Sequence, residues 1–151
     1  MRRRLWAAFL LSLVVALALA GCAAEDPSVV DDSLSGSVFV ITRNKKHEGY
    51  AHRAYGKRGN SVSEEERLLP EDVVEELTSV FFADDLELYI KGKTDGSLTY
   101  SLYDAHFEPL YEKSAEFSAP LYGGVYYLCV DVVWGDATRS EGYQYFFQFD
   151  R

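Results

Sequence analysis

The sequence predicts a mainly β domain, a small antiparallel β-sandwich, from three observations. From residue 86 to the end, apolar side chains recur mostly at every second position, which is the period of a strand with one buried face. With the segments before it, this region gives seven or so short strands separated by close turn signals. Two large apolar faces near the C-terminus need a covering surface, and a second sheet about 10 Å away would provide it.

The first folded elements are expected after residue 36. Residues 38–42 are β-branched or aromatic and predict a strand. Residues 43–68 give no clear assignment, although 47–55 is long enough to include a strand. Pro70 and the two acidic residues after it predict a helix N-terminus, because proline and negative charge are both favoured there. Apolar spacing extends this helix to about residue 81, although Val80 and Phe81 also suit a strand.

Tight turns are expected to join the strands of residues 86–111. Leu86, Leu88 and Ile90 alternate with polar or amphipathic residues, and a second alternating run covers residues 98–103. The Asp95-Gly96 pair between them predicts a β-hairpin. Residues 104–106 predict another turn before an apolar stretch at 107–111.

The last two strands have the clearest pattern. Every second residue from Tyr126 to Trp134 is apolar, and so is every second residue from Tyr143 to Phe149. A polar loop is expected between them at residues 135–142. Phe146 breaks the alternation, so we expect it in a satellite contact or on an exposed patch.

The first 21 residues have the pattern of an export signal. Three arginines precede an apolar run at residues 5–20, which is shorter than the ~20 residues of a membrane-spanning helix. The run ends in Leu19-Ala20-Gly21-Cys22, which resembles the lipobox of bacterial lipoproteins. The resemblance implies a signal peptide at residues 1–21, lipidation of Cys22, and attachment to the extracytoplasmic face of the cell membrane. An uncleaved anchor and an ordinary secretory signal are the alternatives.

A flexible tether is expected at residues 22–36, before a folded domain at 37–151. The tether is rich in small and acidic residues and contains Pro27. Cleavage before Cys22 would leave 12 basic and 24 acidic residues. A chain with this excess of negative charge is repelled by nucleic acid and by anionic lipid. We therefore expect no nucleic-acid partner, and we expect the lipid anchor to attach the protein to the membrane.

Cys129 is expected to be a buried, inert thiol. Lipidation of Cys22 would leave it without a disulfide partner in the chain, and its neighbours in sequence are mostly apolar.

A second resemblance lies in the C-terminal half. Residues 124–127, 130–135 and 143–147 carry a pattern of Gly, Tyr, Val and Trp that resembles the closing hairpin of immunoglobulin-like extracellular domains. Small uncharacterised lipoproteins of Firmicutes type end in similar segments. The resemblance implies an immunoglobulin-like sandwich without the paired cysteines of antibody domains, and it implies no activity.

No sequence motif predicts catalysis, a metal or a cofactor. His47 and His52 are five residues apart, so neither a helix nor a strand places them on one face as a zinc motif requires. His106 lies near Asp104, but no serine stands in a Gly-x-Ser-x-Gly elbow. We therefore expect a noncatalytic protein. A cell-envelope hydrolase that uses His106 or His47 with distant acids, and a structural spacer, are the alternatives.

Two surfaces are expected to bind a partner. Residues 43–58 hold six basic residues and one acid, which suits an anionic partner such as a wall polymer or lipid headgroups. The alternative is a solvated face whose charges pair with nearby acids. The second surface is the loop at 135–142 with the adjoining tryptophan. The candidate binding residues are Arg43, Lys45, Lys46, Arg53, Lys57, Arg58, Trp134, Asp136 and Arg139.

The tyrosines leave a further choice open. An exposed row of them would bind sugar or peptide, whereas buried ones would fill the edges of the core. The expected partners are therefore the membrane, through the lipid anchor, and a protein, a peptide or an envelope polymer.

Overall fold

The structure is a computed structural model that describes Leu34 and residues 36–151. The predicted signal peptide, Cys22 and most of the tether lie outside these residues. The compact unit runs from Leu34 to Arg151, so it begins slightly before the predicted boundary at residue 37. Its elements are β1 (Ser37–Thr42), β2 (Lys45–Glu48), β3 (Tyr50–Arg58), β4 (Ser61–Glu64), α2 (Pro70–Val73), the 3₁₀ turn η1 (Val74–Glu76), β5 (Ser79–Phe81), β6 (Glu87–Lys91), β7 (Thr94–Tyr103), β8 (Pro109–Ser114), β9 (Val125–Gly135) and β10 (Arg139–Asp150).

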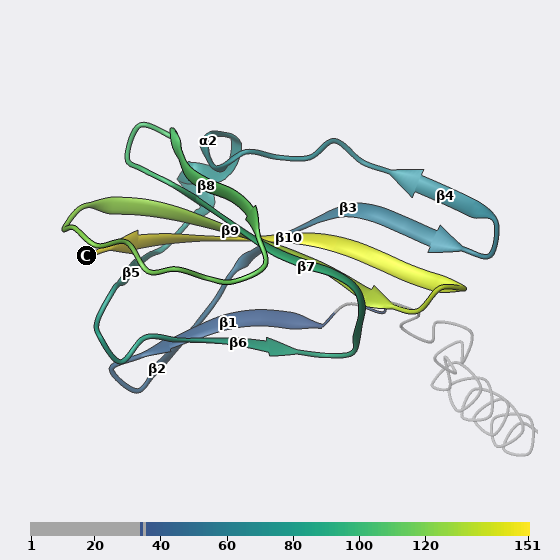
Figure 1. Cartoon of the computed structure of the whole chain (residues 1–151), viewed down its shortest axis with the longest axis horizontal. Helices are drawn as coiled ribbons and strands as arrows, with labels where there is room; N and C mark the ends of the chain where they lie inside the picture. The colour runs from purple at the N-terminus through teal and green to yellow at the C-terminus, as the bar shows by residue number, and fades with distance from the viewer. Residues whose placement is uncertain (1–33, 35) are drawn as a thin grey trace, which may run out of the picture. The chain divides into compact units, whose positions relative to one another are not determined.

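Two sheets make up the domain, which confirms the mainly β sandwich (Figure 1). The small sheet has the order β2-β1-β6, and all its pairs are antiparallel. The large sheet has the order β4-β3-β10-β9-β7-β8, and β5 joins the C-terminal part of β10 in parallel. The two long strands predicted near the C-terminus, β9 and β10, lie at the centre of the large sheet.

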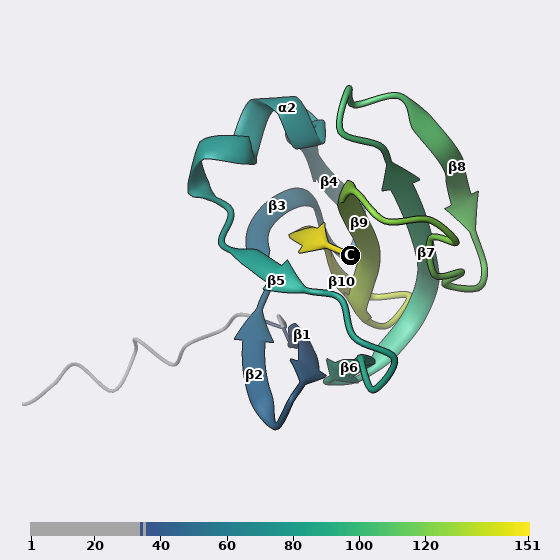
Figure 2. The ribbon, with the colours of Figure 1, turned by 90° about the vertical axis from the view of Figure 1, so that its left-hand side faces the viewer.

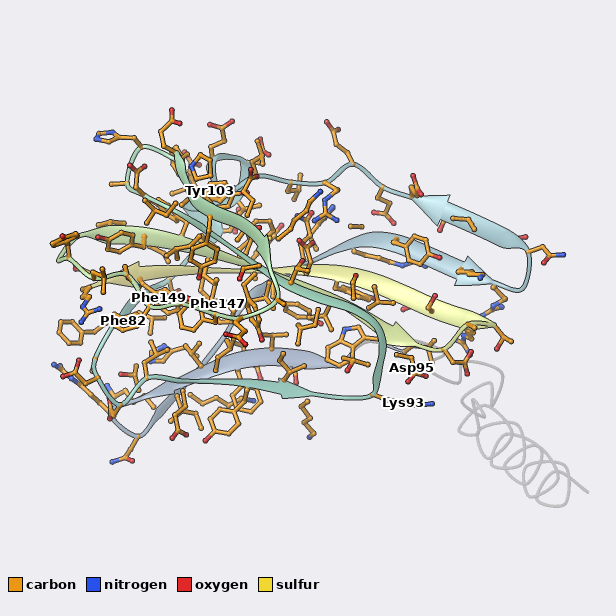
Figure 3. All side chains as sticks on the ribbon, viewed as in Figure 1. Phe82, Lys93, Asp95, Tyr103, Phe147 and Phe149 are labelled. Atoms are coloured by element: carbon orange, nitrogen blue, oxygen red, sulfur yellow. The ribbon has the colours of Figure 1, made fainter. Side chains whose placement is uncertain are left out.

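The main core lies between the two sheets. The predicted apolar faces of β9 and β10 point into it, from Tyr126 to Trp134 and from Tyr143 to Phe149. Val38 and Val40 of β1 meet them from the small sheet and are fully buried. Figure 3 shows Phe147 and Phe149 on the side of β10 that faces the small sheet.

A second cluster covers the opposite face of the large sheet. Figure 2 shows α2 and the small sheet on opposite sides of β9 and β10. Phe146 is 1% exposed there and packs with Val73 of α2, Tyr103, Tyr127 and Cys129. The satellite contact expected of Phe146 is therefore confirmed.

The buried thiol is also confirmed. Cys129 is 4% exposed, and burial raises its pKa to about 12, so the sulfur stays protonated at neutral pH. Gln144 is buried beside it and donates from its side-chain amide to the Cys129 sulfur at 3.6 Å. The same amide group bonds both backbone groups of Leu68, at 2.9 and 3.1 Å, and so holds the segment before α2 against the sheet.

The predicted hairpin at Asp95-Gly96 is wrong. β6 pairs with β1 in the small sheet, whereas β7 pairs with β9 in the large sheet. The chain turns at Gly92 (φ 133°), where an added Cβ would lie 2.5 Å from the ring of Trp134. A Lys93–Asp95 ion pair of 3.3 Å lies in this corner (Figure 3). Packing of a glycine backbone on the tryptophan thus decides the path, and the Asp-Gly pair lies in an irregular part of β7.

Three other boundaries differ from the prediction. The helix begins at Pro70 as predicted but ends at residue 76, and Val80 lies in β5 because its backbone pairs with Phe149. Residues 43–68, which had no clear assignment, form β2, β3 and β4. The loop expected at 135–142 is shorter, because β10 already begins at Arg139.

Candidate anion-binding site

The six basic residues of segment 43–58 do not form one patch. The Arg43 guanidinium lies 4.0 Å from the ring centroid of Phe81, and Phe81 pairs with Asp150, the last residue of β10. Arg58 instead pairs with Arg139, the first residue of β10. A strand of 12 residues is about 37 Å long, so the segment runs from one end of the sandwich to the other. We call these ends the Asp150 end and the Leu34 end, the latter because Leu34 packs there beside Gly135.

At the Asp150 end the basic residues have local partners. Besides its contact with Phe81, Arg43 donates its backbone N–H to Asp85 at 3.0 Å. The Lys46 amine lies 2.5 Å from a Glu48 carboxylate oxygen and 4.4 Å from the ring centroid of Phe39. These contacts fit the interpretation of a solvated face whose charges pair nearby. Lys45 is exposed in the same hairpin.

Four of the predicted binding residues meet at the Leu34 end. Arg53, Lys57, Arg58 and Arg139 line one pocket of about 230 Å³, which we call the basic pocket. Three belong to β3 and the fourth begins β10, 81 residues after Arg58 in the chain. The other lining residues are Gly56, Ser61, Val62, Ser63 and Glu141.

A β-bulge in β3 places Arg53 in this group. Gly142 of β10 pairs with Tyr55, and the next residue, Tyr143, pairs with Arg53, so Ala54 is an extra residue. Side chains alternate between faces, so this extra residue brings Arg53 to the face that holds Gly56 and Arg58. Without it, Arg53 would share the face of Tyr55.

Gly56 provides the space for the Arg53 guanidinium. An added Cβ at Gly56 would collide with Nη2 of Arg53 and would lie 2.9 Å from the hydroxyl oxygen of Ser63. The Ser63 hydroxyl donates to the Gly56 carbonyl at 3.4 Å. Glycine at this position therefore lets a guanidinium and a hydroxyl lie directly over the β3 backbone.

Two acids orient Arg53 without tight pairing. Its guanidinium nitrogens lie 3.7 Å from Glu65 and 3.8 Å from Glu141, beyond ordinary hydrogen-bond distance. The Arg53 side chain is 42% exposed, and ion pairs this accessible to water contribute little. The Glu141 carboxylate also accepts a hydrogen bond from the Tyr143 hydroxyl at 3.2 Å. The pocket thus keeps a net positive lining.

Arg58 and Arg139 face each other across the β3–β10 ladder. Residues directly opposite on neighbouring strands have Cβ atoms about 5 Å apart, so these two side chains start close together. The arrangement is fixed by the two adjoining turns, because the N–H of Gly59 donates to the Thr138 carbonyl at 2.8 Å.

Asp136 positions Arg139. Its carboxylate accepts hydrogen bonds from the Thr138 hydroxyl at 2.6 Å, the Thr138 N–H at 2.8 Å and the Arg139 N–H at 3.0 Å. These hydrogen bonds lower the pKa of Asp136 to about 2, and the bond from the Thr138 hydroxyl has the largest effect. The structure therefore places Asp136 in the turn that sets the start of β10.

Trp134 was expected beside a binding loop, but its side chain is fully buried. Gly36 and Gly92 pack against its ring, so a partner in solution has no access to it. Tyr127 and Phe146 are buried too, so these three residues form no exposed aromatic platform. Five tyrosines fill the core, as one of the two interpretations held, whereas Tyr122 is 78% exposed. The five, all below 10% exposure, are Tyr100, Tyr103, Tyr126, Tyr127 and Tyr145.

The histidines lie apart from one another. The His52 ring Nε2 lies at hydrogen-bond distance, 2.8 Å, from the Glu66 carbonyl oxygen. His106 lies in an exposed turn, and its backbone N–H donates to the Asp104 carboxylate. His47 lies beside a separate hollow of about 260 Å³. In the described part of the chain, no three His, Cys, Asp or Glu side chains are grouped to hold a metal ion.

Part of the site could not be predicted from the sequence. Ser61 and Ser63 carry no motif, and only the β3–β4 pairing brings them to the arginines and to Gly56. An apolar hollow of about 570 Å³ at the Asp150 end, between β8 and the segment before β9, was not predicted either. Its rim includes Leu121 and Tyr122, 83% and 78% exposed, whose neighbours in sequence show no strand periodicity.

Comparison with known proteins gives no relatives. No family model matches the chain, and neither a curated protein nor a solved structure matches it. The immunoglobulin-like resemblance and the lipobox resemblance thus stay predictions. In Leu34 and residues 36–151, no helix is both long and apolar enough to cross a bilayer.

Proposed function

We propose that this chain is a noncatalytic lipoprotein, anchored through Cys22 on the extracytoplasmic face of a cell membrane, whose basic pocket binds a phosphate-bearing anion. The observation that carries the binding proposal is the convergence of three arginines, Arg53, Arg58 and Arg139, on one face of the β3–β10 pair, where they line one pocket together with Lys57. The sequence without residues 1–21 holds twice as many acidic as basic residues, so a cluster of basic residues is opposite in sign to the net charge of the chain.

Phosphate suits the chemistry of this pocket. Guanidinium groups present a planar fork of donors that matches phosphate oxygens. Lys57 pairs with Ser140, so its side chain lies on the other face of β3 and adds only to the positive charge nearby. Ser61 adds a hydroxyl group on the β4 side, where a further phosphate oxygen would accept a hydrogen bond. Envelope polymers with phosphodiester links and phospholipid headgroups both offer this group. The group that the pocket recognises is therefore the phosphate, which both carriers present.

A titration with soluble phosphate tests the binding. The chain from residue 22 onward, with Cys22→Ser to prevent lipidation, is titrated with pyrophosphate and glycerol 1-phosphate and followed by amide NMR shifts. We expect saturable shifts at Gly56, Arg58 and Arg139. Lys57→Gln combined with Arg58→Gln removes two of the cations, and we expect it to weaken binding about tenfold or more, since a charge-assisted hydrogen bond contributes ~1.5–3 kcal/mol.

The matched control removes two cations from the other end. Lys45→Gln combined with Lys46→Gln changes the net charge equally, but these residues lie in the β1–β2 hairpin. We expect the control to bind as the parent does. Equal weakening by both pairs would mean that phosphate responds to net charge only, and no saturable shift would refute the site.

A further inference from the structure

The point at which the chain joins the folded domain is close to the basic pocket. A Cβ at Gly135 would lie 2.8 Å from Cδ1 of Leu34, so Leu34 packs at the last residue of β9. The Tyr145 hydroxyl donates to the carbonyl of Gly36 at 3.2 Å and holds the next part of the chain. Only the turn at 136–138 separates Gly135 from Arg139, so this attachment and the pocket share the Leu34 end.

Further cations lie at this end. The N–H of Gly135 donates to the Lys93 carbonyl at 3.3 Å, and Lys91 pairs with Ser37 at the start of β1. Among the described residues, three acids at this end have local contacts: Asp95 with Lys93, Asp136 with its own turn, and Glu141 with Tyr143 and Arg53. The basic residues of the Leu34 end are Lys57, Arg58, Lys91, Lys93 and Arg139.

The sequence limits how far this end can lie from the lipid anchor. Eleven residues, 23–33, separate Cys22 from Leu34. A fully extended chain of this length reaches about 40 Å, and a flexible one averages much less. A short flexible link keeps its two ends at millimolar effective concentration. Headgroups near the anchor would therefore be presented to the basic pocket at a concentration at which weak binding suffices.

From this placement we infer that the phosphate taken by the basic pocket belongs to anionic phospholipid headgroups of the anchoring membrane, so that the domain docks on the bilayer by its Leu34 end. The inference rests on the proposed function, because it names the carrier of the phosphate. It also separates local from average charge: the chain as a whole and its predicted tether are acidic, but the described residues at the Leu34 end hold more basic than acidic side chains. Docking would turn the Asp150 end, with its apolar hollow, away from the membrane.

Depth-sensitive quenching tests the docking in the lipidated, full-length mature protein. A fluorophore is placed at Asn60→Cys in the β3–β4 turn or at Ala105→Cys in the turn after β7, both exposed. Cys129 does not compete for the label, because its sulfur is buried and its pKa is raised to about 12. Each labelled protein is inserted into vesicles of phosphatidylcholine, alone or mixed with phosphatidylglycerol, that contain a headgroup quencher.

We expect phosphatidylglycerol to increase quenching at position 60 and not at position 105. Lys57→Gln with Arg58→Gln should weaken this dependence roughly 25-fold, since each basic residue near an anionic surface contributes a factor of about five. Lys45→Gln with Lys46→Gln should leave it unchanged. Added salt should reduce it, because screening weakens attraction to the surface.

The outcomes separate the two proposals. Saturable binding of soluble phosphate without any effect of phosphatidylglycerol at position 60 would overturn the docking and leave the phosphate site standing, with an envelope polymer as its remaining carrier. Equal quenching at positions 60 and 105 would also overturn it. Absence of both phosphate binding and lipid dependence would refute the proposed function itself.

Discussion

Replacing Trp134 with alanine is expected to lower the free energy of unfolding by about 4 kcal/mol, because a fully buried large side chain leaves both lost contacts and a cavity. Domains of this size are stable by only ~5–15 kcal/mol, so the variant would be close to its folding limit at physiological temperature. Gly36 and Gly92 pack their backbones against this ring, and neither has a side chain to fill the space. Urea denaturation of parent and variant measures the loss.

Tyr145→Phe separates packing from hydrogen bonding at this position. The Tyr145 hydroxyl accepts from the indole N–H of Trp134 at 3.3 Å and donates to Gly36. Burial raises the pKa of Tyr145, so the hydroxyl remains a donor up to strongly alkaline pH. We expect Tyr145→Phe to cost about 1–2 kcal/mol. A Trp134→Ala loss no larger than this would show that the ring does not hold the corner between the sheets.

Phe146→Ala is expected to cost about 3 kcal/mol and to open the second cluster. Phe146 lies at 1% exposure between Val73 of α2 and Cys129 of β9, so its removal frees the helix from the sheet. The reactivity of Cys129 reports this opening, because its thiol is protected in the native state by burial. We expect thiol labelling of Cys129 to accelerate on the order of 100-fold.

Phe146→Leu is the matched control for that prediction. It keeps most of the apolar volume, so we expect it to cost less than about 1.5 kcal/mol and to change labelling of Cys129 little. If Phe146→Ala left both the denaturation midpoint and the labelling rate unchanged, the large sheet would not depend on the cluster on its α2 side.

The regular part of the fold is predictable because it rests on one local rule. Alternation of apolar residues placed β6, β9 and β10 correctly, since each strand has one face against the main core. The β-branched and aromatic composition of residues 38–42 placed β1. Apolar alternation does not predict β2, β3 and β4. Their residues are mostly exposed, and their strands are fixed by pairing with distant partners such as β10.

The connections were harder to predict because tertiary contacts decide them. Asp95-Gly96 is a good hairpin sequence, but the chain changes sheets where Gly92 meets Trp134, a contact between residues 42 positions apart. The helix pattern after Pro70 was interrupted for a similar reason, since Val80 gains a backbone partner in Phe149. Local propensity is a weak prior wherever such long-range pairs compete.

The candidate site was predictable in composition and not in arrangement. Sequence identified Arg53, Lys57, Arg58 and Arg139 as basic residues with binding potential. It could not show that antiparallel pairing brings Arg139 opposite Arg58, nor that one extra residue at Ala54 turns Arg53 toward them. For the same reason it joined to them Arg43, Lys45 and Lys46, which the length of the sandwich separates from the pocket.

Mass spectrometry of the N-terminal peptide from membrane-extracted protein tests the central claim most directly, because both the place of the protein and its docking depend on a lipid at Cys22. The account predicts a chain that begins at Cys22 and carries a diacylglyceryl group on its sulfur. An unmodified Cys22 thiol, or residues 1–21 still attached, would contradict it.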